Sequence, residues 1–183
     1  MNVRKDNIIK TTLKGHPMTF HTTWGLFSPK NIDYGTNLML QHIKVNKNDT
    51  ILDLGCGYGA LGLTLAKEAP EGTAHLIDKD FVAIDYVQLN AKNCNIDNIG
   101  AYLSNGFSNV SKEIQFDVIV SNIPAKVGNE MLQILIEDAY TYLKPGGTFY
   151  VVTVAGLSKY IKRQFTEIFN NYKKIKTSKT YTV

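Results

Sequence analysis

From residue 50 onward, short apolar runs rich in β-branched residues alternate with longer stretches in which apolar positions recur at helical spacing. The short runs predict strands at residues 50–54, 73–78, 99–103, 116–121 and 148–154, and the longer stretches predict helices at 60–69, 81–93, 129–143 and 157–170. This alternation is typical of βαβ units with parallel strands. The predicted fold is a doubly wound, Rossmann-like α/β sheet whose ligands lie outside the carboxyl ends of the strands.

Both ends of the chain depart from this alternation. Residues 172–177 and 179–183 predict a closing hairpin, which makes the sheet seven-stranded and mostly parallel with one antiparallel edge strand. Before residue 50 the sequence is aromatic and irregular, with a helix predicted at 37–43. We expect residues 20–36 to cover one mouth of the sheet. The predicted organisation is one domain over residues 1–183, with an N-terminal cover (1–45) and a Rossmann-like core (46–183).

The run Lys144-Pro145-Gly146-Gly147 is a strong stop signal. It predicts the end of the helix at 129–143 and a turn before the strand at 148–154.

Composition limits the class of protein. With 183 residues, 44% of them hydrophobic, the chain can bury one core. No apolar run approaches the roughly 20 residues that cross a bilayer, and the N-terminus lacks a signal-peptide core, so a soluble, cytoplasmic protein is expected. The two cysteines, Cys56 and Cys94, have no metal-ligand spacing; we expect buried free thiols and no metal site.

The formal net charge of +4 is unevenly distributed. Residues 1–30 carry five Lys or Arg against one acidic residue, residues 156–183 carry seven against one, and the segment between them has a net charge of −6. A basic periphery favours a polyanionic partner such as RNA, because lysine and arginine release phosphate counterions. The alternative is that these charges are ordinary solvated surface. We expect a monomer or a homodimer without a membrane partner.

The loop after the first core strand reads Asp53-Leu54-Gly55-Cys56-Gly57-Tyr58-Gly59. Its three glycines allow a sharp turn into the next helix and a close backbone approach to a ligand. Residues 57–62 also match the GxGxxG dinucleotide fingerprint. Asp53 argues against a nicotinamide cofactor, because its charge would repel a pyrophosphate but attract a cationic sulfonium or ammonium. A chain of this length also leaves little room for a separate substrate domain. The loop therefore favours S-adenosyl-L-methionine (SAM).

Two further loops follow neighbouring strands. Asp78 ends the second strand, where a carboxylate can accept hydrogen bonds from both ribose hydroxyls, and Lys79 is assigned to the same site. Asp80 fits the alternative role of capping the next helix. Asn105 and Gly106 follow the third strand, where Asn105 could bond the edge of an adenine ring or form a simple Asn-Gly turn.

Together these residues resemble class I methyltransferases of the "methyltransferase small domain" family, which includes small-subunit ribosomal RNA guanine-N2 methyltransferases. The resemblance covers roughly residues 20–155. It is carried by the loop at 51–59 with Asp78, by Ser104-Asn105, by Ser121-Asn122-Ile123-Pro124, and by two segments before the first strand, Gly25-Leu26-Phe27-Ser28 and Ile32-Asp33-Tyr34-Gly35-Thr36. It implies a SAM-dependent N-methyltransferase that acts on a base amine of ribosomal RNA, with the cofactor held by Asp53, Gly55, Cys56, Gly57, Gly59, Asp78, Lys79, Asn105, Gly106 and Asn122.

In such enzymes the fourth strand ends in Asn-Pro-Pro-aromatic. The resemblance implies that Asn122, Ile123 and Pro124 form the catalytic segment, in which the Asn122 oxygen and the backbone carbonyl of Ile123 accept the two amine hydrogens and orient the nitrogen lone pair. Here Ile123 replaces the first proline, and Ala125 replaces the aromatic residue that would stack on the substrate. Lys126 and Asn129 are further candidates for substrate contact, although Asn129 could instead cap the next helix.

A stacking ring could come instead from Trp24, Phe27 or Tyr34. For each of these, core packing is the favoured interpretation. Two alternatives to RNA methylation therefore stay open: a methyltransferase for a protein amide or a small molecule, and a SAM-binding module without catalysis.

Overall fold

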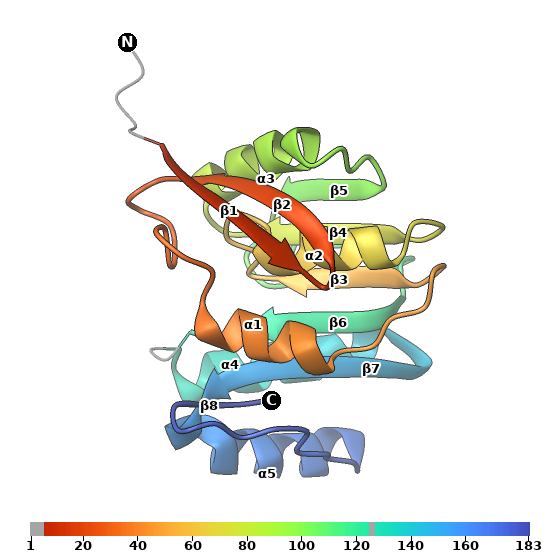
Figure 1. Cartoon of the computed structure of the whole chain (residues 1–183). Coiled ribbons are helices and arrows are strands. Elements are labelled where there is room, and N and C mark those ends of the chain that lie inside the picture. Colours follow the sequence, from red (N-terminus) through yellow and green to blue (C-terminus); the bar gives the residue numbers. More distant parts are fainter. Residues whose placement is uncertain (1–5, 125–126) are drawn as a thin grey trace.

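The computed structural model describes residues 6–124 and 127–183. Its centre is a six-stranded sheet with the order β5-β4-β3-β6-β7-β8 (Figure 1). The pairs from β5 to β7 are parallel, whereas β8 runs antiparallel to β7 at the edge. The strands are β3 (Thr50–Leu54), β4 (Thr73–Asp78), β5 (Ile99–Leu103), β6 (Phe116–Asn122), β7 (Leu143–Val154) and β8 (Tyr181–Thr182).

The fold class predicted from the sequence is confirmed, but the number of strands is corrected. Among the described residues the sheet has six strands rather than seven. Within the predicted strand at 172–177, Ile175 and Lys176 bond the backbone of Val183, and Thr177 forms one isolated bridge with Thr182. This segment is lysine-rich and mostly exposed, so it has little apolar surface to hold it against the sheet.

A second correction concerns the start of β7. This strand begins at Leu143 and not at residue 148, and the predicted stop signal at 144–147 lies inside it. The pairing with β6 is irregular there, with a register shift between Phe116 and Val118. Gly146, at φ +84°, accommodates this irregularity.

In the part of the chain that the structure describes, five α-helices cover the two faces of the sheet. Figure 1 shows α1, α2 and α3 in front of the sheet and α4 behind it. The strands of the centre are buried on both sides, so that Ile51 belongs to one apolar core and its neighbour Leu52 to the other. Among the described residues, no helix has both the length and the apolar character needed to cross a membrane. The bounds are α1 (Tyr34–His42), α2 (Ala60–Glu68), α3 (Phe81–Asn93), α4 (Asn129–Tyr142), the short 3₁₀ helix η1 (Ala155–Leu157) and α5 (Ser158–Phe169).

The N-terminal segment contains a hairpin that the sequence pattern did not predict. Strands β1 (Asn7–Leu13) and β2 (His16–Thr22) pair antiparallel around Lys14 and Gly15, both of which have positive φ. A two-residue turn of this kind matches the twist of a hairpin. Strand β2 packs against α3 and α2.

Asn90 of α3, which is fully buried, fixes the hairpin to the core. Its side chain exchanges hydrogen bonds with the backbone of His21 and donates one to the carbonyl of Tyr58 in the glycine loop. One amide therefore joins the N-terminal hairpin to the loop that follows β3.

Candidate active site

A cavity of about 490 Å³ lies at the carboxyl ends of β3, β4, β5 and β6. This volume is within the range of about 300–1,000 Å³ that is typical of cofactor sites. The walls come from the loops after these strands, from the segment before α1 and from the first turns of α4. Of the site residues predicted from the sequence, Asp53, Gly55, Cys56, Gly57, Asp78, Lys79, Asn105, Gly106, Asn122, Ile123 and Pro124 line the cavity.

The glycine loop is shaped by its own backbone. Gly55, Gly57 and Gly59 all have positive φ, between 54° and 92°, which other residues rarely adopt. The backbone N–H groups of Gly55 and Cys56 both donate to the carbonyl of Ile77 on the neighbouring strand. Gly59 does not contribute to the cavity wall; it is the N-cap residue of α2.

Asp53 is buried, with 2% of its surface exposed. Its Oδ2 atom accepts a hydrogen bond of 2.7 Å from the backbone N–H of Gly62 in the first turns of α2. A side chain at position 62 would collide with Asp53 and Leu76, so glycine permits this approach. Burial raises the pKa of Asp53 to about 7; the Gly62 bond opposes this shift and the nearby charge of Asp78 adds to it. A cationic ligand beside this carboxylate would favour its charged form.

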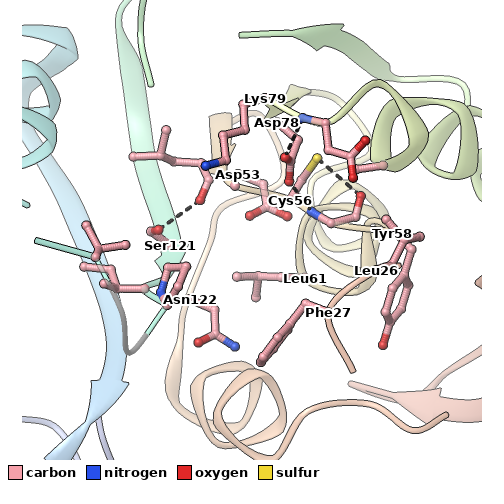
Figure 2. A pocket seen from close by; sticks show the side chains of 18 of the residues that line it. Leu26, Phe27, Asp53, Cys56, Tyr58, Leu61, Asp78, Lys79, Ser121 and Asn122 are labelled. Carbon is pink, nitrogen blue, oxygen red and sulfur yellow. Dashed lines mark hydrogen bonds between the residues drawn. The ribbon is translucent and has the colours of Figure 1, made fainter. Parts of the chain in front are cut away.

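Asp78 holds the loop in place from β4. One carboxylate oxygen accepts from the N–H of Gly57 at 2.9 Å and the other from the N–H of Asp80 at 3.0 Å. Asp80 caps α3 by accepting from the N–H of Val82, as its position predicted. Lys79 is exposed, and Figure 2 shows its side chain above the cavity beside Asp78.

The turn after β5 is the Asn-Gly turn that the sequence offered as an alternative. Gly106 has a φ of +58°, and the hydroxyl of Ser104 donates to its carbonyl at 2.7 Å. Asn105 is exposed and also lines the cavity. The turn therefore leaves Asn105 at the cavity, where it can meet a ligand.

Asn122 ends β6 at the opposite wall. Its amide nitrogen donates to Asp33 at 2.9 Å and to the hydroxyl of Thr36 at 3.0 Å. The N–H of Ile123 donates to Val152 on β7, and the Ile123 side chain is buried in the core. The sequence motif containing Asp33 and Thr36 was noted, but their contact with Asn122 was not predicted. The local signal that could have drawn attention to these two residues is their spacing, because an aspartate three residues before a threonine is typical of the start of a helix.

Ala125, which replaces the aromatic residue of the family pattern, and the neighbouring candidate Lys126 lie outside the described residues. Among the described residues, Met131 and Leu135 of α4 add apolar surface to the wall beside Pro124.

The expectation that Trp24, Phe27 and Tyr34 pack in the core is wrong. Their exposed fractions are 78%, 61% and 59%. Phe27 lines the cavity, and Figure 2 shows its ring and the Asn122 amide both pointing into it. Trp24 and Tyr34 do not line the cavity, so of the three rings it is Phe27 that can meet a ligand there.

The two cysteines are buried free thiols, as predicted. Burial raises the pKa of the Cys56 thiol well above its usual value, and the charges of Asp53 and Asp78 raise it further. Cys56 therefore remains a neutral part of the cavity wall. Within residues 6–124 and 127–183, no cluster of three or more His, Cys, Asp or Glu residues could hold a metal ion.

Comparison with known proteins gives relatives with named activities. The chain is 33% identical over 183 residues to the ribosomal RNA small subunit methyltransferase C of Buchnera aphidicola, a match that covers 97% of this chain and 55% of that protein. It is 33% identical over 141 residues to the uncharacterized protein YbxB of Bacillus subtilis, covering 76% of this chain and 70% of YbxB.

Among solved structures, a T. thermophilus 16S rRNA guanine-N2 methyltransferase in complex with AdoMet and guanosine matches with a TM-score of 0.88 and 26% identity. The match covers 97% of this chain and 49% of that one. The chain thus spans about half the length of the ribosomal RNA methyltransferases that it matches. The model of the family described as "Methyltransferase small domain" matches residues 17–183. The chain belongs to the methyltransferase small domain family.

Proposed function

We propose that this chain transfers a methyl group from SAM to the exocyclic amine of a guanine in ribosomal RNA. The observation that carries the proposal is that the glycine loop after β3 and Asn122 at the end of β6 line one cavity. A cofactor bound on the loop would thereby face a side chain suited to orienting an amine. The structural relative solved with AdoMet and guanosine supports both ligands.

The loop side of the cavity fits SAM. Asp53 is a buried carboxylate whose charged form a sulfonium or ammonium would stabilise. Asp78 keeps lone pairs on both carboxylate oxygens in addition to its two backbone bonds, so it can accept from ribose hydroxyls. Lys79, Asn105 and Gly106 lie farther along the same wall, where an adenine ring would extend. Bound there, SAM supplies an electrophilic methyl carbon on a positively charged sulfur.

The opposite wall fits a flat, amine-bearing base. An exocyclic amine is a poor nucleophile while its lone pair is delocalised into the ring. Asn122 Oδ1 and the backbone carbonyl of Ile123 would accept its two hydrogens and turn the lone pair toward the methyl carbon. As the new N–C bond forms, the bond between the methyl carbon and sulfur would break, and its electron pair would go to sulfur. The amine would then lose one proton to solvent.

Phe27 replaces the missing aromatic residue of the Asn-Pro-Pro-aromatic pattern in this proposal. Its exposed ring lines the cavity on the Asn122 side and offers a face on which a base can stack. RNA is favoured as the carrier of that base by the exposed lysines and arginine of residues 159–179.

The test is methyl transfer from isotopically labelled SAM to ribosomal RNA from a strain that lacks the gene, followed by mass spectrometry of the nucleosides. The expected product is N2-methylguanosine, with little incorporation into wild-type RNA because its site is already methylated. Equal incorporation into both RNAs, or label found in protein or small molecules instead, would contradict the proposal.

A further inference from the structure

A network of polar side chains surrounds the Asn122 amide, and two of its members, Asp33 and Thr36, also line the cavity. Both amide hydrogens of Asn122 are used, one by Asp33 Oδ2 at 2.9 Å and one by Thr36 Oγ1 at 3.0 Å. A carboxylate can only accept, so the amide group that faces Asp33 must be the nitrogen. The Asn122 oxygen is thereby left for a donor in the cavity. The orientation of the amide is thus set by Asp33.

Asp33 is itself held by a backbone group of its own segment and by a hydroxyl from a segment that is distant in sequence. Its Oδ2 atom accepts from the backbone N–H of Thr36 at 3.1 Å, the bond that caps α1. Its Oδ1 atom accepts from the hydroxyl of Tyr181 on β8 at 3.1 Å, a contact across 148 residues of sequence. Figure 1 shows α1 in front of the sheet at the side where β7 and β8 lie. The network therefore joins the segment before α1 to the antiparallel edge of the sheet.

The close packing at Gly35 makes the Tyr181 contact possible. A Cβ atom at position 35 would lie 2.9 Å from Asp33 Oδ2 and 3.0 Å from the Tyr181 ring. Burial, and then the Asp33 charge, raise the pKa of Tyr181, so the phenol remains a hydrogen-bond donor at neutral pH.

The negative charge of Asp33 is of the sign that would stabilise the positive charge formed on the substrate during methyl transfer. Transfer of a methyl group from a sulfonium to a neutral amine places positive charge on the amine nitrogen. A carboxylate that accepts a hydrogen bond from the Asn122 amide group polarises this amide and stabilises that charge. Because Thr36, Asn122 and Tyr181 all donate to Asp33, it acts through Asn122 and does not take the proton itself.

We propose that Asp33, held by Tyr181, is a positioning residue that fixes the Asn122 amide with its oxygen toward the substrate amine. This inference rests on the proposed function, since it assumes that Asn122 meets an amine. It adds to the site a charged group and a residue that lies near the other end of the chain.

The first test is Asp33→Asn, which keeps a side chain able to cap α1 but removes the charge and allows the Asn122 amide to turn over. We expect kcat to fall about 10- to 100-fold, as for other small misplacements of reacting groups, while the Kd of SAM and the KM of RNA change less than about twofold. The matched control is Asp117→Asn. Asp117 bonds the Thr50 N–H and Lys144 away from the cavity, so its loss should lower stability without lowering kcat.

A second pair of variants isolates the hydroxyl. Tyr181→Phe removes one donor from Asp33 and should lower kcat about 3- to 10-fold, an effect of the size of one modest hydrogen bond. The control Tyr142→Phe removes a hydroxyl that donates to the carbonyl of Val110, outside the cavity wall, and should keep the parental kcat. Equal loss in both tyrosine variants would mean that only stability was changed.

A readout without substrate separates this inference from the proposed function. The side-chain amide of Asn122, assigned in a nitrogen-15 NMR spectrum through its loss in Asn122→Asp, should shift and exchange faster in Asp33→Asn but not in Asp117→Asn. An unmoved resonance, or a parental kcat in Asp33→Asn, overturns the positioning role. If the parent chain methylates no RNA, the proposed function fails, and the NMR result alone decides whether Asp33 orients Asn122.

Discussion

The two walls of the cavity are built in different ways. The wall proposed to bind the cofactor (the cofactor wall) is formed by loops after neighbouring strands, where backbone N–H groups bond carboxylates that are near in sequence, such as Gly57 with Asp78, 21 residues apart. The wall proposed to face the substrate (the substrate wall) is formed by side chains of the segment before α1, of α1 itself and of the end of β6, and its Asp33 is held by Tyr181 of the edge strand β8. The first wall is built from residues that are near in sequence and form a recognisable motif. The second wall is built from residues that come together only when the chain folds.

This difference implies that the two walls can be damaged separately. Changes on the substrate wall should affect methyl transfer and leave SAM binding intact, and changes on the cofactor wall should do the reverse. Crossed effects would mean that the division is wrong.

The largest effect is expected for Asn122→Ala. Removing the proposed amine acceptor should lower kcat about 10²- to 10³-fold, the usual loss for one preorganised group at a reacting centre. Calorimetry should show a Kd of SAM within about twofold of the parent. Asn98→Ala is the control, because Asn98 bonds three carbonyls between residues 66 and 72 away from the cavity and should affect stability alone. A variant at position 122 with parental kcat contradicts the assignment.

Next in size is the cofactor wall itself. Asp78→Ala and Asp53→Ala each remove a carboxylate proposed to bond or attract SAM, at a cost of about 1.5 to 3 kcal/mol in binding free energy, or roughly 10- to 150-fold in Kd. Exposed Asp97, which does not line the cavity, provides the control Asp97→Ala for loss of one negative charge. Unchanged affinity in both cavity variants would refute their placement.

Phe27 tests the substrate wall by shape and not by charge. Phe27→Leu keeps an apolar side chain but removes the ring, and the loss of base stacking should lower kcat/KM for RNA about 5- to 150-fold, corresponding to roughly 1 to 3 kcal/mol. Phe27→Tyr should retain most of the activity because it keeps the ring. If both variants behave alike, stacking on this ring is not what binds the base.

The smallest expected effect is a dependence of SAM affinity on pH, which arises from Asp53 on the cofactor wall. Because the pKa of Asp53 is about 7, SAM affinity should fall as the pH drops below 7, by at most the factor expected for Asp53→Ala, since protonation removes the charge that attracts the cofactor. In the free protein the folded pKa exceeds the unfolded value of 3.8, so the folded state binds the extra proton between these values. The free energy of unfolding should therefore fall as pH rises through this window.

Asp53→Asn is the control for both pH measurements. It should flatten the part of the SAM binding profile due to this carboxylate and remove its contribution to the stability profile, while other groups titrate as before. Identical profiles for the parent and this variant would show that Asp53 is already charged in the free protein.

The sequence predicted what depends on local pattern. The family resemblance and the fold class are confirmed, and helices such as α3 were placed at their observed bounds. The loop from Asp53 to Gly59 and the acids after β4 were recognisable because glycine spacing and strand ends carry their chemistry in consecutive residues.

The errors concern residues whose environment is set by distant contacts. Aromatic Trp24, Phe27 and Tyr34 suggested a core, because a single sequence cannot show that they face a cavity or solvent. The hairpin of β1 and β2 was missed because the contacts that fix it to the core come from distant residues such as Asn90 in α3. The contact between Asn122 and Asp33 could not be predicted for the same reason, because Asp33 is held by Tyr181 near the other end of the chain.

The bond between Tyr181 and Asp33 also bears on the order in which the molecule matures. Contacts across many residues require the closure of a long loop, which is entropically costly and slow compared with local pairing. The glycine loop takes its shape from the consecutive elements β3, α2 and β4, with one further bond from Asn90 of α3. During refolding, SAM binding should therefore return before methyl transfer, and catalytic activity should report complete folding more strictly than cofactor affinity does.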